Sequence, residues 1–378
     1  MPYSKSDIID ALESVAQTGV PSYGTATILD IGTKGYLDFF ESEIIDELIT
    51  NGGSTCRFYE GTYGSGKTHL LHLFHDMAIR KRMLVVEVEL SQILNLTDWH
   101  SITKYVLEKI QCQFDGIVVQ SLPKILDAMA GNGWTPNKPL RAYYLTHTGF
   151  ANAIETYIKR NRELHPEAKD KLAQFLLGEK IGALDLRRNG ISGIKNPLSK
   201  RNAELVLNTV LSSLYHMGFP GTMVLFDETD QTFSHTERVT NKTIFGANIM
   251  RRLIDACSLS GIKGVLVAFA VLPNFIPACA GVYQALGERL MVSKKGRSVL
   301  GWRSPVLRLD AINSISERDD FVDAAIDKFI RFADLIGVDK DLRSQLKKVG
   351  DEILNNHAGL DFRRVLIKRY ASIVLQYQ

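Results

Sequence analysis

The segment Gly61-Thr62-Tyr63-Gly64-Ser65-Gly66-Lys67-Thr68 decides the fold class of this 378-residue chain. It matches the pattern G-x-x-x-x-G-K-[S/T], in which glycines let backbone N–H groups surround phosphate oxygens. A strand is predicted before it at 56–60, and an amphipathic helix is predicted after it. The positive end of that helix adds to the attraction for phosphate. The segment therefore predicts a nucleotide-phosphate site between a strand and a helix.

The residues of this loop are predicted to bind Mg·ATP. Lys67 is expected to reach the β- and γ-phosphates, and the Thr68 hydroxyl is expected to ligate Mg²⁺. His69, His72 and His75 are not interpreted as a metal site, because the spacing i, i+3, i+6 drifts around a helix. The residues assigned to the nucleotide are Gly61, Thr62, Tyr63, Gly64, Ser65, Gly66, Lys67, Thr68 and His69.

A pair of acidic residues is predicted at the end of another strand. The apolar run 222–226 is followed by Asp227 and Glu228. Asp227 is expected to hold Mg²⁺ through water, and Glu228 is expected to polarise the attacking water. The glutamate favours hydrolysis over phosphoryl transfer to a metabolite. Together with a long helical insertion, it argues against a small-molecule kinase.

Two arginines are candidates for contact with the γ-phosphate. Arg363 begins a helix near the C-terminus, from which it would fold back onto the nucleotide. Arg289 ends a helix between two strands and would reach the nucleotide of a neighbouring subunit. For each of them the alternative is an ordinary solvated surface arginine.

Strands that alternate with helices predict an α/β fold with a parallel sheet. Helices are expected at 6–16 and 35–50, and a helical insertion without strong strands is expected at about 92–202. We predict an ATPase domain over 1–310 and a C-terminal helical lid over 311–378. The expected strands are 56–60, 84–90, 222–226, 264–272 and 305–309.

Composition excludes several other classes of protein. Hydrophobic residues make up 45% of the chain and charged residues 23%, a globular balance that argues against a disordered chain or a fibre. The four cysteines form no CxxC pair, which indicates free buried thiols in a reducing compartment. The uncharged stretch 264–287 is broken by Pro273 and Pro277 and is not expected to span a membrane. With no signal peptide recognised, we expect a cytoplasmic protein.

The formal net charge of +3 names no partner, but two stretches are strongly basic. Residues 187–201 and residues 294–308 each contain five Lys or Arg and no acid, and the second stretch includes Trp302 for base stacking. Contacts of this kind with a DNA backbone are independent of sequence and sensitive to salt. The alternatives are solvated basic loops and, for 294–308, a contact with a neighbour's nucleotide.

These residues together resemble an AAA+-type P-loop ATPase, and more narrowly the ATP-binding proteins of BREX (bacteriophage exclusion) systems, the BrxC/BrxD-type family. The resemblance implies an AAA+-type (ASCE) parallel sheet flanked by helices, with a helical lid. It also implies an oligomeric ATPase in phage defence, with copies of itself, single-stranded or duplex DNA and other defence proteins as partners, and no membrane. The segments that carry it are 19–21, 60–68, 175–178, 217–221, the strand ending in Asp227-Glu228, 253–255 and 273–275.

One departure from the family bears on activity. Its members usually carry a threonine before the proline at the end of the strand 264–272, where it senses the γ-phosphate. This chain has Leu272, which cannot form a hydrogen bond through its side chain, and Asn274 is the candidate substitute. A slow ATPase and a non-hydrolysing, ATP-dependent switch or scaffold of a defence complex therefore both remain as hypotheses.

Overall fold

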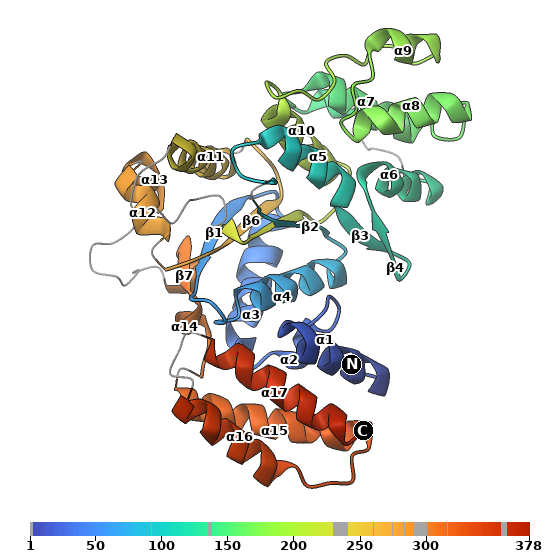
Figure 1. Ribbon diagram of the computed structural model, residues 1–378. Helices are drawn as coiled ribbons and strands as arrows, with labels where there is room; N and C mark the ends of the chain where they lie inside the picture. Colours follow the sequence, from blue (N-terminus) through green and yellow to red (C-terminus); the bar gives the residue numbers. More distant parts are fainter. Residues whose placement is uncertain are drawn as a thin grey trace.

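Figure 1 shows the computed structural model, which describes residues 3–91, 93–134, 138–229, 241–259, 261–273, 275–282, 284–290, 301–315, 317–356 and 361–378. Among these residues, seven strands form one sheet. In chain order they are β1 (Thr55–Glu60), β2 (Leu84–Glu89), β3 (Gln111–Phe114), β4 (Ile117–Gln120), β5 (Thr222–Asp227), β6 (Val265–Val271) and β7 (Val306–Arg308).

The sheet has the strand order β4-β3-β2-β5-β6-β1-β7. The strands β2, β5, β6, β1 and β7 are mutually parallel and agree with the predicted ranges within one residue at each end. The predicted α/β fold with a mostly parallel sheet flanked by helices is therefore confirmed. β6 lies between β1, which precedes the glycine-rich loop, and β5, which ends in Asp227.

One part of the sequence prediction is wrong, because the region 92–202 contains two strands. β3 and β4 form a hairpin, and β3 pairs antiparallel with β2 through Gln111 and Val85. Its turn is Asp115-Gly116, with φ of 48° and 83°, as a tight two-residue hairpin turn requires. The segment Ile110-Gln111-Cys112-Gln113-Phe114 does alternate between apolar and polar residues, but each strand has only four residues and β4 is mostly exposed, so the signal is short.

Side-chain alternation assigns each strand residue to one face of the sheet. In β5, Met223 and Leu225 belong to the core on one face, whereas Val224 and Phe226 belong to the core on the other. Asp227 therefore lies on the face of Met223 and Leu225. That face is covered by α3 (Lys34–Phe39), the π-helix η1 (Phe40–Ile49) and α4 (Lys67–Arg80).

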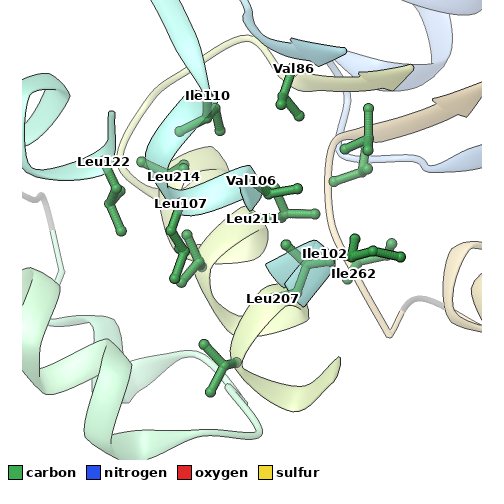
Figure 2. Close-up of a cluster of buried hydrophobic side chains, with 14 of the residues drawn as sticks. Val86, Ile102, Val106, Leu107, Ile110, Leu122, Leu207, Leu211, Leu214 and Ile262 are labelled. Carbon is green, nitrogen blue, oxygen red and sulfur yellow. The ribbon is translucent and has the colours of Figure 1, made fainter. Parts of the chain in front are cut away.

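The opposite face is covered by α5 (Trp99–Lys109), α10 (Ala203–His216) and α11 (Asn241–Ser258). Figure 2 shows how α5 and α10 meet there, with Val106, Leu211 and their neighbours packed beside Val86 of β2. The same core extends outward into the insertion and toward β7. The remaining elements of this core are α6 (Leu122–Gly131), η2 (Leu140–Ala142), α7 (Thr148–Lys159), α8 (Pro166–Leu176), α9 (Ala183–Arg188), α12 (Phe275–Val282) and α13 (Gln284–Leu290). Two short elements, η4 (Gly301–Arg303) and α14 (Leu309–Ile312), pack instead on the face that carries Met223 and Leu225.

The C-terminal helices form a separate core with the start of the chain, as Figure 1 also shows. This core joins α15 (Arg318–Ile336), α16 (Arg343–Asn356) and α17 (Phe362–Gln376) to α1 (Lys5–Thr18) and α2 (Ala26–Leu29). The helices α15, α16 and α17, which lie in the range predicted as a lid and are called the lid helices below, therefore pack with α1. None of the helices in the described ranges is long and apolar enough to cross a membrane.

Two lid cations hold α1 in place. Arg364 donates to the carbonyl of Thr18 at 2.7 Å, and Lys368 donates to the carbonyl of Gln17 at 2.7 Å. These carbonyls lie in the last turn of α1, where a helix has unpaired acceptors and a partial negative charge. Gly19 ends the helix with φ of 79°, in the left-handed region that glycine adopts readily.

The core beneath α10 gives a direct test of the packing. We expect Leu211→Ala to lower the free energy of unfolding by about 2–5 kcal/mol, because it removes a fully buried side chain and leaves a cavity. Leu205→Ala on the same helix is the control, since Leu205 is 43% exposed. Its expected effect is below about 0.5 kcal/mol. Urea denaturation followed by circular dichroism measures both, and equal losses would contradict the assigned faces.

Candidate functional site

The loop between β1 and α4 depends on three glycines for different reasons. Gly64 and Gly66 have φ of 68° and 100°, which side-chain-bearing residues rarely adopt. Gly61 is restricted by close packing, since a Cβ there would lie 2.3 Å from Ser65 Oγ. Its backbone N–H donates to the carbonyl of Val271 at 3.0 Å, which ties the loop to the end of β6. The loop is thus fixed in front of α4, whose N-cap is Gly66.

Polar side chains of the loop bond to its own carbonyl groups. Lys67 Nζ donates to the carbonyls of Gly61 and Thr62, both at 3.0 Å. Ser65 Oγ donates to Thr62 O at 2.7 Å. The ammonium group of Lys67 also lies 5.3 Å from the centre of the Tyr63 ring. Lys67 is therefore held at the loop, where an anion bound by the backbone N–H groups would meet its charge.

A hydrogen bond joins α4 to the end of β5. Thr68 Oγ1 donates to Asp227 Oδ2 at 2.7 Å, and the backbone N–H of Glu228 donates to Asp227 Oδ1 at 2.8 Å. Asp227 is 5% exposed. Its burial raises the pKa of this carboxyl group, while the hydrogen bonds from Thr68 and Glu228 act in the opposite direction. A carboxylate and a hydroxyl side by side are ligands that suit Mg²⁺.

Glu228 has an unusual backbone conformation, with φ of 51° in the left-handed region. For a residue with a side chain this conformation costs of the order of 1 kcal/mol or more, and such residues cluster at functional sites. Glu228 borders the pocket in front of the loop. The next residue, Thr229, is fully buried, and its hydroxyl has no hydrogen-bond partner among the described residues.

One pocket brings together most of the predicted site. It lies between the glycine-rich loop, the segment after α1 and the lid helices, and the predicted residues in its wall are Tyr63, Gly64, Ser65, Gly66, Lys67, Thr68, His69, Glu228 and Arg363. The sequence analysis assigned no role to the apolar part of the wall. That part of the wall comes from segments far apart in the sequence. Among the segments that carry the family resemblance, only residues 19–21 contribute to it. It includes Val15, Val20, Pro21, Leu29, Ile31, Leu309, Ile312, Phe321 and Ile367.

The lid meets the loop through Asp361, and Arg363 lies in the wall of the same pocket. The Arg363 guanidinium donates to the carbonyl of Ile315 at 3.2 Å and lies 4.7 Å from the centre of the Phe321 ring. Burial lowers the pKa of Arg363, and Asp310 opposes this effect. A Cβ on Gly64 would lie 2.1 Å from Asp361 Oδ1, so the first residue before α17 packs directly on the loop.

His69 lies in the pocket wall, and burial lowers the pKa of its ring to about 4, so the ring is neutral at pH 7. Its Nε2 is buried and forms no hydrogen bond with the part of the chain that the structure describes. His72 Nδ1 lies 2.8 Å from the carbonyl of Pro21, and His72 Nε2 lies 3.6 Å from Glu87 Oε1. In the part of the chain that the structure describes, no group of three or more His, Cys, Asp or Glu could hold a metal ion.

Arg289 is not in the pocket wall. Its Nε donates to Asp255 Oδ1 of α11 at 2.9 Å, and Asp255 also pairs with Arg251 at 3.0 Å. Leu272 follows β6, and its carbonyl accepts a hydrogen bond from Phe275 N at 2.9 Å. The candidate substitute Asn274 lies outside the described residues.

The structure describes all of the basic stretch 187–201 but only part of the basic stretch 294–308. All five cations of 187–201 are exposed, and Figure 1 shows α9 at the outer end of the insertion, away from α4. Residues 291–300, with three of the five cations of 294–308, lie outside the described residues. Trp302 is partly covered by contacts with Tyr36 and Phe39. Arg303 and Arg308 form ion pairs with Glu43 and Asp310.

The sheet, its flanking helices and the glycine-rich loop between β1 and α4 are consistent with a P-loop type domain. The family model described as BREX system ATP-binding protein BrxC/D matches residues 2–127 and 141–317. The chain therefore belongs to this family of ATP-binding proteins of the BREX phage-defence system. No curated protein matches the chain.

The raised pKa of Asp227 gives a prediction about stability. Protonated Asp227 favours the folded protein, so stability is lost as pH rises from the ordinary aspartate pKa of about 3.9 through the raised folded value. Asp227→Asn removes this loss and can keep both hydrogen bonds if its amide donates to Thr68. We expect the variant to melt at a higher temperature than the wild type at pH 7, with the difference shrinking toward pH 4.

Thermal unfolding without nucleotide or Mg²⁺, measured across this pH range, checks the prediction. Asp339→Asn is the control, because Asp339 is exposed on the lid. A variant that melts below the wild type at pH 7, or a difference that does not change with pH, would contradict the assigned cost of burying this carboxylate.

Proposed function

We propose that the protein is an AAA+ ATPase that hydrolyses ATP and couples its nucleotide state to oligomer formation and DNA engagement in phage defence. The observation that carries the proposal is the 2.7 Å hydrogen bond between Thr68 and Asp227, which brings two Mg²⁺-type ligands together beside the glycine-rich loop. The strand order, with β6 between β1 and β5, supports the assignment to the AAA+ class.

The proposed binding step uses the backbone of the loop and the start of α4. N–H groups of residues 61–69 bind the phosphates, and Lys67 exchanges its bonds to the loop carbonyls for phosphate oxygens. The apolar wall from α1 and the lid covers the base. Thr68 and Asp227 would hold Mg²⁺, which supplies positive charge at the phosphates when it is bound.

The proposed hydrolytic step uses Glu228. Its carboxylate orients a water molecule toward the γ-phosphate and accepts a proton from it. Arg363, which already borders the pocket from the lid, stabilises negative charge on the phosphates. The contact between Asp361 and Gly64 makes the lid sensitive to whether the loop is filled, because a phosphate there would meet the Asp361 carboxylate.

The division of roles between Glu228 and Lys67 is testable. We expect Glu228→Gln to keep the affinity for ATP and to lower kcat at least about 100-fold, the ordinary contribution of a general base. We expect Lys67→Ala to weaken ATP binding itself, because it removes the cation at the phosphates. Phosphate release under steady-state conditions and titration with a fluorescent ATP analogue measure the two effects.

Leu272 favours a second candidate function, a non-hydrolysing switch or scaffold that ATP holds in one state. Its side chain cannot bond to a γ-phosphate or to water. The same assays distinguish the two functions. A wild-type protein that binds ATP tightly but releases no phosphate, with or without duplex DNA, would overturn the ATPase proposal and support the switch.

Arg289 is proposed to act on the nucleotide of a neighbouring subunit, after leaving its ion pair with Asp255. We expect a mixture of Lys67→Ala and Arg289→Ala chains to regain part of the ATPase activity, because some interfaces then contain one intact copy of each residue. Each variant measured alone is the control, because every interface in it lacks one of the two residues. An assembled mixture without any gain would place Arg289 outside the reaction.

The exposed cations of residues 187–201 are the proposed contact with the DNA backbone. They lie on the insertion, and the segment contains no acid that would compete with phosphate.

A further inference from the structure

A groove lies on the insertion side of the sheet, far from the nucleotide pocket. Its wall comes from the segment 142–146, from α10 and from the segment 261–263 that leads into β6. His216 precedes β5 and Lys263 precedes β6, so the groove lies at the edge where these parallel strands begin. The glycine-rich loop follows the end of β1 and therefore lies at the opposite edge.

The groove presents aromatic rings and a cation. The ring of Tyr143 stacks on the ring of His216, with centroids 3.7 Å apart and an angle of 12° between their planes. Tyr144 beside it is fully exposed. Lys263 is the cation of the wall, and none of the described residues that line the groove is an Asp or Glu.

The backbone that carries these rings is fixed by hydrogen bonds. The N–H of Leu145 donates to the carbonyl of Tyr143 at 2.8 Å, and the hydroxyls of Thr146 and Thr209 lie 3.2 Å apart. Thr209 Oγ1 also accepts a bond from the N–H of His147 at 2.9 Å. Tyr144 therefore extends into solvent from an anchored segment, so its ring is accessible to a stacking partner.

We propose that this groove binds single-stranded DNA, with an unpaired base stacked on Tyr144 and an adjacent phosphate on Lys263. Aromatic rings next to a cation are the usual elements of a single-strand site. No residue of the wall is acidic, and Thr146 and Asn208 offer hydrogen-bonding groups, whereas a site for an apolar peptide needs an apolar wall.

The position of the groove fits the proposed DNA contact. α10 has 14 residues and runs from the groove to the cations Lys200 and Arg201 at its other end. At 1.5 Å per residue this is about 21 Å, a length that a few nucleotides span. The inference rests on the proposed DNA engagement and does not depend on ATP hydrolysis.

The test is the binding of a fluorescently labelled oligo-dT, followed by anisotropy at several salt concentrations. We expect Tyr144→Ala to weaken binding about 10-fold and Tyr144→Phe to preserve it, because stacking needs the ring and not the hydroxyl. Lys263→Gln lowers the salt slope by about 0.7, the value for one phosphate contact on a single strand. Tyr3→Ala is the matched control, because Tyr3 is an exposed tyrosine next to the lid-bound α1. All variants are expected to keep the wild-type melting temperature.

A second measurement locates the base directly. An oligonucleotide that contains 5-iododeoxyuridine is expected to crosslink to Tyr143 or Tyr144 on irradiation. Crosslinks found only elsewhere, or Tyr144→Ala with wild-type affinity, would overturn the proposal. A Tyr144→Ala protein that binds oligo-dT normally but no longer self-associates would assign the groove to a protein contact and would also overturn it.

The double variant Arg187→Ala with Arg188→Ala separates the stacking groove from the broader proposal that the cations of residues 187–201 contact DNA. If it weakens DNA binding while Tyr144→Ala does not, the basic stretch binds DNA and the stacking groove is wrong. If the wild type binds neither oligo-dT nor duplex DNA at low salt, both proposals fail.

Discussion

The hydrogen bond between Thr68 and Asp227 connects the start of α4 to the end of β5. It requires that the Asp227 side chain lies on the face of the sheet that α4 covers. Asp227 continues the face of Met223 and Leu225, and that face is covered by α4. Gly66 adopts the left-handed backbone conformation that precedes α4, and Thr68 therefore lies in the first turn of this helix. A shift of β5 by one residue would move the carboxylate to the other face of the sheet, away from the loop.

The pocket in front of this bond is built by the lid and α1 as much as by the sheet. Arg364 and Lys368 hold the end of α1, while Arg363 and Asp361 lie against the pocket and the loop. The unit that would cover a bound nucleotide therefore contains both ends of the described chain. A change in the position of α17 would move α1 with it, because the two helices share a core.

Local signals allowed the strand, loop and helix around Lys67 to be predicted, and the apolar run before Asp227 is long enough to define β5. The hairpin β3–β4 was missed because its strands have four residues each, although Asp115-Gly116 and the apolar-polar alternation of residues 110–114 marked it. The apolar wall of the pocket depends on packing between segments some 300 residues apart, which no local pattern encodes. The pairing of Arg289 with Asp255 is likewise a tertiary contact that spacing alone does not reveal.

The central claim is that Thr68 and Asp227 act as one Mg²⁺ site for a nucleotide held by the loop. The most direct test is the affinity for a fluorescent ATP analogue with Mg²⁺ and with EDTA, in the wild type, Thr68→Val and Asp227→Asn. We expect the wild type to bind the analogue more tightly with Mg²⁺ than with EDTA. Both variants are expected to bind it with the wild-type affinity in EDTA and to gain no affinity when Mg²⁺ is added. A wild-type affinity that Mg²⁺ does not change, or variants that keep the full gain, would contradict it.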